Sequence, residues 1–368
     1  MIKREWPMPE KALLVLEDGS SYQGLAFGAL SPTYGEVVFN TSMTGYQEML
    51  TDPSYAGQIV MPTYPIIGNY GINGEDIESS NIKVSGFVVR EHATNPSHNL
   101  SQMTLDDYLS SQGIMGIAGV DTRAITRRLR SQGVMMGIMT LGTSAEAALM
   151  EIKNLPKYDT TDLVSVVSTT HNYIWGDDSN DGPLIVVSDY GLKYNIMRLL
   201  KSMGCRVMAI PSQTSAQDIL SLKPDGLIIS PGPGDPSLLD FQAATVKKLI
   251  EELPIMGICL GHQILARAMG AKTFKLKFGH RGGNHPVQNT LTKKVHITAQ
   301  NHGFAVDTES LPPELEITHV NLNDGTIEGL RHKHKPVMSI QFHTEASPGP
   351  MDNVYLFSTF LGMIRDHS

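Results

Sequence analysis

From Pro183 onward the sequence alternates short apolar runs with amphipathic stretches, and this alternation limits the fold more than any other feature. The runs PLIVVSD, CRVMAIP, DGLIISP and PIMGICL have the length of strands, and a stretch with helical spacing follows each of them. Strands that are apolar on both faces and alternate with helices form parallel sheets with helices on both sides. Residues 183–368 are therefore predicted to form an α/β domain with a doubly wound, mostly parallel sheet.

The preceding residues show a different pattern. The run KALLVLEDGSSYQGLAFG predicts a strand, an Asp-Gly turn and a second strand. Helical spacing recurs in three stretches, one of which has Asp121 as its N-cap and Gly133 at its C-terminus. Residues 1–170 are predicted to be a mixed α+β domain, and the polar, acidic segment 171–182 is predicted to be a linker.

Composition excludes several classes of protein. The 368 residues carry a formal net charge of -8 without a basic block, which argues against nucleic-acid binding. The longest apolar runs have strand length and the first residues lack an uninterrupted apolar segment, so neither a membrane span nor a signal peptide is expected. The two cysteines, Cys205 and Cys259, form no C-x-x-C pair and suggest neither a disulfide framework nor a zinc site. A cytoplasmic protein without a bound metal is expected.

The stretch PIMGICLGHQ places a cysteine where an apolar strand turns sharply into a helix. Cys259 lies between Gly257 and Gly261 in the pattern G-x-C-x-G, the nucleophile-elbow pattern with sulfur in place of the serine oxygen. The thiolate is the nucleophilic form of cysteine, and the start of a helix favours negative charge. A buried cysteine is more often a small apolar side chain, and Cys205 is interpreted in that way. The flanking glycines favour a nucleophile at Cys259.

A thiolate nucleophile needs a general base and a group that orients this base. Among 13 histidines, His343 follows the apolar run PVMSIQF and precedes Glu345 by two positions. Side chains two apart point to the same face of a strand, so the carboxylate would fix the tautomer of the imidazole. Backbone N–H groups of Leu260 and of Gly232 or Gly234 are candidates for an oxyanion hole. No Gly-Lys dipeptide occurs, so the chain has no Walker A loop for ATP.

These motifs resemble those of a known family. GICLGHQ, SPGPGDP and FHTEASPGP are similar to the three signatures of the triad-type, class I glutamine amidotransferases, whose fold is flavodoxin-like. FGHRGGNHPV, QNHGFAVD and, in the first half, GEVVFNTSMTGYQEMLTDPSYAGQIV and GIAGVDTRAITRRLR resemble the small-subunit family of carbamoyl phosphate synthetase. The resemblance covers nearly the whole chain.

The resemblance implies an activity and a partner. Cys259 would attack the side-chain amide of L-glutamine to give a γ-glutamyl thioester and ammonia, His343 would transfer the protons, and Glu345 would orient His343. A large subunit that binds ATP, Mg²⁺ and bicarbonate would receive the ammonia, in a heterodimer that assembles further, so no cofactor is expected on this chain. Residues 1–170 would contact that subunit and complete a glutamine site between domains. The residues implied to bind glutamine are Ser42, Gly232, Gly234, Leu260, Gln263, Asn301, Gly303 and Phe304.

Two alternatives stay open at this point. A free-standing γ-glutamyl hydrolase, or the amidotransferase of another synthetase, would keep the catalytic domain but not the motifs of the first half. A non-catalytic subunit that retains the fold for assembly would usually have lost its cysteine, whereas Cys259, His343 and Glu345 are all present.

Overall fold

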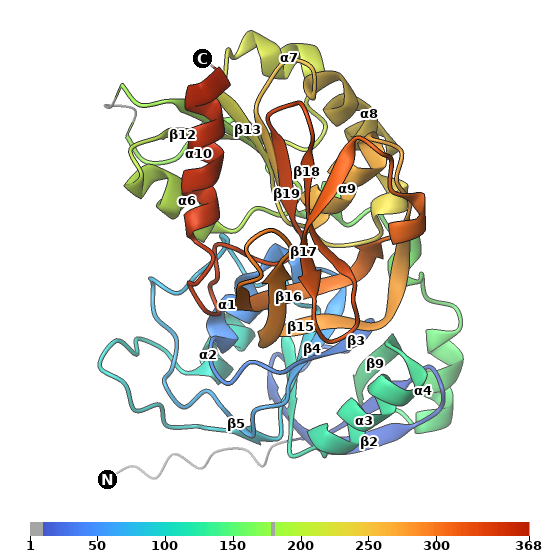
Figure 1. Cartoon of the computed structure of the whole chain (residues 1–368). Coiled ribbons are helices and arrows are strands. Elements are labelled where there is room, and N and C mark those ends of the chain that lie inside the picture. The colour runs from blue at the N-terminus through green and yellow to red at the C-terminus, as the bar shows by residue number, and fades with distance from the viewer. Residues whose placement is uncertain (1–9, 178–180, 368) are drawn as a thin grey trace. The chain divides into compact units, whose positions relative to one another are not determined.

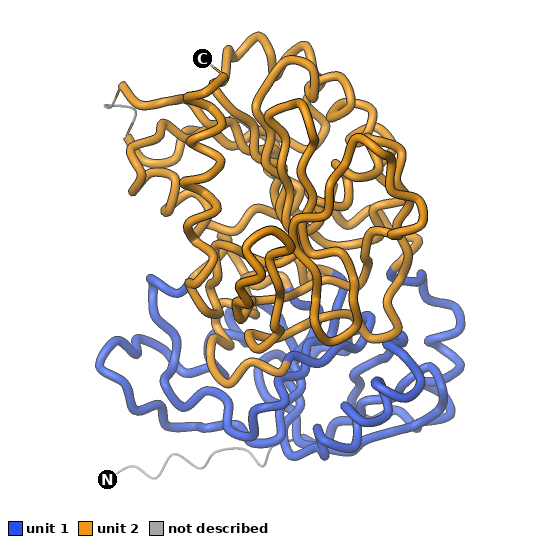
Figure 2. Tube along the Cα trace, viewed as in Figure 1, with its two compact units in different colours: residues 1–40, 57–76, 84–158 blue, residues 41–56, 77–83, 159–368 orange. Residues whose placement is uncertain are grey.

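The computed structural model describes residues 10–177 and 181–367, which fold into two compact units (Figure 2). Unit 1 comprises the described residues up to 40 together with 57–76 and 84–158, and unit 2 comprises 41–56, 77–83 and the described residues from 159 on. The predicted linker includes residues 178–180, and the N-terminal stretch in which no signal peptide is expected includes residues 1–9; these residues lie outside the described ones. Three segments of the predicted first domain, residues 41–56, 77–83 and 159–170, therefore belong to unit 2.

Unit 1 is built on a closed barrel, which the sequence analysis did not predict. The chain of neighbours runs β1-β2-β8-β6-β4-β3-β9, and β9 pairs back with β1. A separate two-stranded sheet consists of β5 and β7. The strands are β1 (Lys11–Leu16), β2 (Ser21–Gly28), β3 (Thr33–Asn40), β4 (Gln58–Pro62), β5 (Ile66–Ile67), β6 (Gly86–Val88), β7 (Glu91–His92), β8 (Met115–Ala118) and β9 (Met135–Leu141).

Local signals in unit 1 were predicted correctly. β1 and β2 form the expected antiparallel hairpin around the Asp-Gly turn. The helices are α2 (Leu105–Ser111), α3 (Thr122–Gln132) and α4 (Ala145–Ile152). The Asp121 side chain caps α3 by accepting a hydrogen bond from Ala124 N, and Gly133 ends the helix with φ 102°.

Unit 2 contains a ten-stranded mixed sheet within its described residues (Figure 1). Its order is β10-β12-β11-β13-β14-β19-β18-β17-β15-β16, and β12, β11, β13, β14 and β19 run parallel to one another. β10 (Tyr173–Ile174) lies in the segment predicted to be a linker. The remaining strands are β11 (Leu184–Asp189), β12 (Arg206–Pro211), β13 (Gly226–Ile229), β14 (Ile255–Ile258), β15 (Thr273–Asn289), β16 (Val295–Val306), β17 (Leu315–Asn321), β18 (Ile327–His332) and β19 (Val337–Ile340).

Helices cover both faces of the parallel part of this sheet, as predicted (Figure 1). Ile185 and Val187 of β11 pack on one face with apolar side chains of α6 and α10, and Val186 between them packs on the other face with α7, α8 and α9. The two apolar clusters explain why these strands are apolar at every position. The helices of unit 2 are α1 (Tyr46–Thr51), α5 (Val164–Val167), α6 (Tyr194–Ser202), α7 (Ala216–Ser221), α8 (Asp240–Leu249), α9 (Leu260–Ala268) and α10 (Tyr355–His367).

The other half of the sheet differs from the prediction of a mostly parallel arrangement. β18, β17, β15 and β16 join through antiparallel pairs, and β15 and β16 are long strands whose pairing contains register shifts. This region lies in the sequence between β14 and β19, where the strand–helix alternation stops. Among the helices of the described residues, none combines the length and the apolar character that a membrane span requires.

Candidate active site

Cys259 lies at a sharp turn between β14 and α9. β14 ends at Ile258 and α9 begins at Leu260, so Cys259 alone makes the connection, with φ 53° and ψ −105°. A residue other than glycine rarely adopts positive φ, and such strain concentrates at functional sites. The side chain is 1% exposed, and the backbone N–H of Cys259 donates to Ile340 O of β19 at 2.8 Å. The predicted elbow is present, and its strand is anchored to the neighbouring strand.

The two glycines of the G-x-C-x-G pattern are required by close backbone packing. A Cβ atom on Gly257 would lie 2.6 Å from Gly261 O, and one on Gly261 would lie 2.1 Å from Ile229 O of β13. Neither distance is compatible with a side chain. The glycines allow α9 to turn directly over its own strand and to pack against the adjacent one, and this leaves the first N–H groups of α9 beside Cys259.

His343 and Glu345 meet as predicted, although by a different route. Nδ1 of His343 lies 2.6 Å from Oε1 of Glu345, and the two side chains are 3% and 0% exposed. The prediction that both residues project from one extended strand is wrong. β19 ends at Ile340, His343 forms an isolated bridge with Ala299, and Glu345 lies in a turn. A turn therefore brings the carboxylate to the imidazole.

The charges of this pair depend on their surroundings. Burial would raise the pKa of Glu345, but Lys193 and His343 outweigh it and lower the pKa to about 2. Burial would lower the pKa of His343, but Glu345 and Cys259 raise it. With Nδ1 engaged by Glu345, Nε2 is the nitrogen left for Cys259. The Cys259 thiol lies 3.5 Å from Asn301 O, to which it donates.

Two residues that the sequence analysis missed hold Glu345. Lys193 is 2% exposed, and its Nζ lies 3.1 Å from Glu345 Oε1 and 2.5 Å from Ala346 O. Nδ2 of Asn195 donates to the backbone oxygen of Glu345 at 2.6 Å. Lys193 is the N-cap residue of α6 and follows the carboxyl end of β11. The rule that ligands gather at the carboxyl ends of parallel strands was the signal that could have found it.

The residues implied to bind glutamine lie in unit 2. Gln263 Nε2 donates to Phe304 O at 2.8 Å and to Gln341 Oε1 at 3.0 Å. Asn301, whose oxygen faces Cys259, donates from Nδ2 to Asp52 Oδ2 at 2.9 Å. The structure therefore links Gln263, Asn301 and Phe304 to one another or to Cys259 through short contacts.

Ser42 departs from the expectation that a second domain completes the site. Residues 41–56 belong to the same compact unit as Cys259. A Cβ atom on Gly283 would lie 3.6 Å from Ser42 Oγ, and Thr41 N donates to Arg281 O at 3.1 Å. The segment comes from the first half of the sequence but folds onto the part of β15 around residue 282.

The loop after β13 holds the remaining predicted residues. A Cβ atom on Gly232 would lie 2.1 Å from Tyr190 O and 2.8 Å from Leu260 Cδ2, so Gly232 lies against the first residue of α9. Gly234 has φ 91°. Ser230 Oγ accepts a hydrogen bond from Tyr190 N at 2.9 Å and joins this loop to the one after β11. A Cβ atom on Gly303, which lies on β16, would be 3.3 Å from Arg281 Nη2.

Two other side chains behave as small buried groups. Cys205 is fully buried in the apolar core, and burial raises the pKa of its thiol to about 11, which agrees with its interpretation as a small apolar side chain. His262, beside Cys259 in the sequence, is also fully buried, and burial lowers its pKa to about 3. Its Nδ1 lies 2.9 Å from Ser339 Oγ, so the ring packs inside unit 2.

Comparison with known proteins identifies the class of this unit. Residues 186–363 match the class-I glutamine amidotransferase family, and the elbow at Cys259 and the His343–Glu345 pair lie within this range. Unit 2 therefore contains a class-I glutamine amidotransferase domain.

The rest of the chain and its relatives specify the family further. Residues 14–139 match the CPSase domain of the carbamoyl-phosphate synthase small chain. The carbamoyl phosphate synthase small chain of Solidesulfovibrio magneticus is 48% identical, with 96% of this chain and 98% of the relative covered. Those of Aquifex aeolicus (47% identical, 97% and 100% covered) and of a Synechococcus strain (50% identical, 97% and 94% covered) are similar. The chain belongs to the carbamoyl phosphate synthase small chain family.

Proposed function

We propose that this chain is the glutamine-hydrolysing subunit of a carbamoyl phosphate synthetase. The observation that carries the proposal is the nucleophile elbow at Cys259 beside a buried imidazole whose Nδ1 is held by Glu345 at 2.6 Å. A carboxylate that orients the imidazole leaves Nε2 available for proton transfer, as in the Ser-His-Asp arrangement. Membership of the family supports the same function.

In the proposed mechanism, Cys259 transfers its thiol proton to Nε2 of His343 and attacks the side-chain amide carbon of L-glutamine. The tetrahedral oxyanion is stabilised by the N–H groups of Leu260 and Gly232. His343 returns the proton to the nitrogen, the carbon–nitrogen bond breaks, and ammonia leaves a γ-glutamyl thioester. Water then attacks the thioester with His343 as base, and glutamate and the free thiol are released.

Glutamine would contact Ser42, Gly232, Gly234, Leu260, Gln263, Asn301, Gly303 and Phe304. The hydrogen bonds of Gln263 to Phe304 O and of Asn301 to Asp52 support this assignment, because they fix two of the polar side chains close to Cys259. The positive φ of Cys259 also supports it, since a strained nucleophile needs a rigid surrounding.

Further parts of the proposal concern organisation and partners. The catalytic domain would be the doubly wound, flavodoxin-like fold of residues 183–368, preceded by a domain of residues 1–170 that contacts a large subunit and by a linker at 171–182. The large subunit would bind ATP, Mg²⁺ and bicarbonate in the cytoplasm and use the ammonia, in a heterodimer that assembles further.

The test is glutamine hydrolysis by the full chain, alone and with a carbamoyl phosphate synthetase large subunit. We expect weak activity alone, a rise with the partner, and loss of activity in Cys259→Ser with ammonia-dependent synthesis retained. Glu345→Ala should reduce the rate less than Cys259→Ser, because an orienting group usually contributes less than the nucleophile. Activity that is indifferent to the partner would indicate a free-standing hydrolase, and unchanged activity of Cys259→Ser would refute the mechanism.

A further inference from the structure

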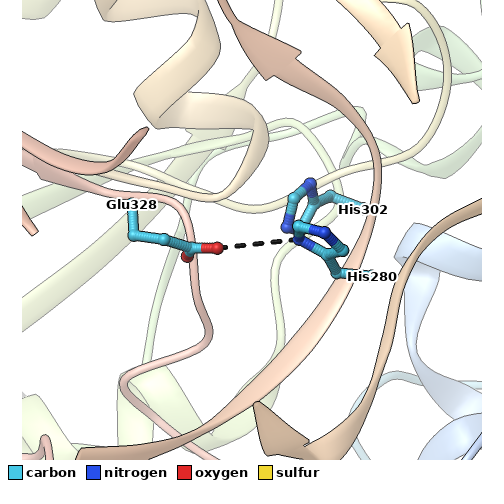
Figure 3. A group of neighbouring side chains, drawn as sticks. All are labelled: His280, His302 and Glu328. Atoms are coloured by element: carbon cyan, nitrogen blue, oxygen red, sulfur yellow. Dashed lines mark ion pairs between the residues drawn. The ribbon is translucent and has the colours of Figure 1, made fainter. Parts of the chain in front are cut away.

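Three buried side chains from three strands of unit 2 converge outside the catalytic triad (Figure 3). They are His280 of β15, His302 of β16 and Glu328 of β18, and each offers a ligand atom within 4.8 Å of the other two. Their exposed fractions are 5%, 5% and 0%. Buried histidine and carboxylate groups need partners, so the hydrogen bonds of this cluster identify which atoms are engaged.

Nε2 of His280 is held by a carboxylate, whereas Nδ1 has no hydrogen-bond partner among the described residues. Its Nε2 lies 2.8 Å from Asp324 Oδ2, an arrangement in which Nε2 donates its hydrogen. Nδ1 is buried, makes no hydrogen bond among the described residues, and lies 3.6 Å from Glu328 Oε1. This orphaned nitrogen and the carboxylate oxygen therefore face each other across a gap too wide for a hydrogen bond.

Both ring nitrogens of His302 face oxygen acceptors. Nδ1 lies 2.8 Å from Phe304 O, and Nε2 lies 2.9 Å from Gln300 Oε1. The Gln300 amide is oriented by its Nε2, which donates to Thr298 Oγ1 and to Glu328 Oε2. A neutral imidazole carries only one N–H. One of its nitrogens must then face an oxygen acceptor without a hydrogen between them.

We propose that His280 Nδ1, His302 Nε2 and Glu328 Oε1 bind a Zn²⁺ ion. Two imidazole nitrogens and one carboxylate oxygen form a common donor set for zinc, with a further position for water. The outer contacts have the form that zinc ligands require: Asp324 accepts from the Nε2–H of His280, and Phe304 O accepts from the Nδ1–H of His302. The ion would bind the unpartnered Nδ1 of His280. It would also separate His302 Nε2 from Gln300 Oε1, which otherwise face each other as two acceptors.

The alternative is a proton in place of the metal. Asp324 Oδ2 and Glu328 Oε1 lie 2.8 and 3.6 Å from the two ring nitrogens of His280, so the cluster already favours a positive charge there. A proton on Nδ1 would satisfy His280 but leave the acceptor contact of His302 in place. This proposal differs from the expectation of no metal on the chain, which considered only the cysteines, and it does not depend on the proposed glutaminase function.

The ion would have a structural role. It would cross-link β15, β16 and β18 at one point of the sheet. Phe304 O, which accepts from His302, also accepts from Gln263, and the neighbouring Asn301 faces Cys259. Zinc should therefore stabilise unit 2 and hold the part of β16 that passes the active site.

The test measures the metal directly in the full-length chain, prepared without a polyhistidine tag. Elemental analysis after gel filtration should find about one zinc per chain, and the apoprotein made with a chelator should regain it and unfold at a higher temperature. Cobalt in place of zinc should give visible absorption bands that respond to each ligand substitution. His280→Ala and the nearly isosteric Glu328→Gln should lose the bands, and Asp324→Asn should weaken zinc affinity about 10- to 100-fold without removing a ligand.

The matched control is His334→Ala, because His334 is an exposed histidine of the turn after β18. This variant should bind zinc and cobalt like the parent chain. Circular dichroism separates metal loss from misfolding: Glu328→Gln that is folded but metal-free supports the proposal. A parent chain without zinc whose unfolding temperature and spectrum ignore zinc and cobalt would overturn it, as would equal loss of metal in His334→Ala.

Discussion

Lys193 is a buried cation whose removal should destabilise unit 2 strongly. Its Nζ lies 3.1 Å from Glu345 Oε1, and Asp52 and Glu78 add negative charge nearby. Burial would lower the pKa of Lys193, but these three carboxylates raise it, so the side chain stays charged. Lys193→Met keeps the length of the side chain and removes the charge. The buried carboxylate of Glu345 then loses one of its two cationic partners and keeps only His343, at 2.6 Å.

The structure permits an estimate of the cost. Two unit charges 3.1 Å apart interact by about 5 kcal/mol at an effective dielectric constant of about 20. Measurements on other proteins indicate that removal of one partner of a buried pair costs about 3–5 kcal/mol. We therefore expect Lys193→Met to lower the free energy of unfolding by about 3–5 kcal/mol, and with an m value of about 3 kcal/mol/M the urea midpoint should fall by roughly 1–2 M.

Helix α6 offers a matched control at Lys201. Its Nζ lies 3.0 Å from Asp177 Oδ1, nearly the distance of the Lys193 pair, but the Asp177 side chain is 72% exposed. Lys201→Met should cost less than about 1 kcal/mol. Trp175 packs against Tyr194 at the start of α6, with ring centroids 4.9 Å apart, so its fluorescence during urea unfolding would report on this region. The chain has two tryptophans, and a Trp6→Phe background leaves Trp175 as the only one.

A double-mutant cycle tests whether the uncompensated charge is the cause. If Glu345→Gln is introduced first, Lys193→Met should cost at least about 2 kcal/mol less than in the parent chain, because a neutral amide remains in place of the carboxylate. Equal, small losses for Lys193→Met and Lys201→Met would refute the reasoning, since burial would then make no difference to the ion pair. So would a large loss for Lys193→Met that is unchanged by Glu345→Gln.

Two further predictions concern pH and packing. Burial would lower the pKa of His343, but Glu345 and Cys259 raise it to about 10. The stability that this group contributes is therefore complete below pH 6.5 and is lost as the pH rises to about 10. The free energy of urea unfolding should decline across this range, and less steeply in His343→Gln; identical slopes of free energy against pH would contradict the prediction. Gly261→Ala should lower the free energy of unfolding by about 3 kcal/mol, measured by thermal unfolding, because its Cβ would lie 2.1 Å from Ile229 O. Gly362→Ala in α10 is the control: the nearest atom to its Cβ lies 3.9 Å away, so this change should be neutral or stabilising. Equal effects of the two substitutions would disprove the packing argument.

The local pattern of the sequence predicted much of unit 2. Apolar runs followed by helical spacing identified β11, β12, β13 and β14, and the two apolar clusters on opposite faces of the sheet explain why that pattern is reliable. The elbow was also predictable, because the glycines around Cys259 are required by backbone distances within a few residues and to the adjacent strand. Features that depend on neighbours in sequence could be predicted well.

Features that depend on distant pairing could not. Closure of the barrel in unit 1 requires β1 to pair with β9, for example Ala12 with Leu141, and no local periodicity specifies that partner. The strand partners of β15 are likewise not encoded in its own pattern, which alternates only in part. The meeting of His343 with Glu345 was predicted from strand alternation, yet a turn produces it. The correct contact came from an incorrect local structure.

The carboxyl ends of adjacent parallel strands explain why these particular residues meet. β11, β13, β14 and β19 are neighbours in the sheet, and each delivers one part of the site just beyond its last residue: Lys193, Gly232, Cys259 and His343 in that order. The order β12-β11-β13-β14-β19 changes direction between β11 and β13, next to the loops that carry Lys193 and Gly232, and then continues through β14 to β19. Such a change opens a crevice between loops at a sheet edge. The backbone hydrogen bond from Cys259 N to Ile340 O joins β14 to β19 there, so that Cys259 and His343, more than 80 positions apart in sequence, lie close enough for Cys259 to raise the pKa of His343.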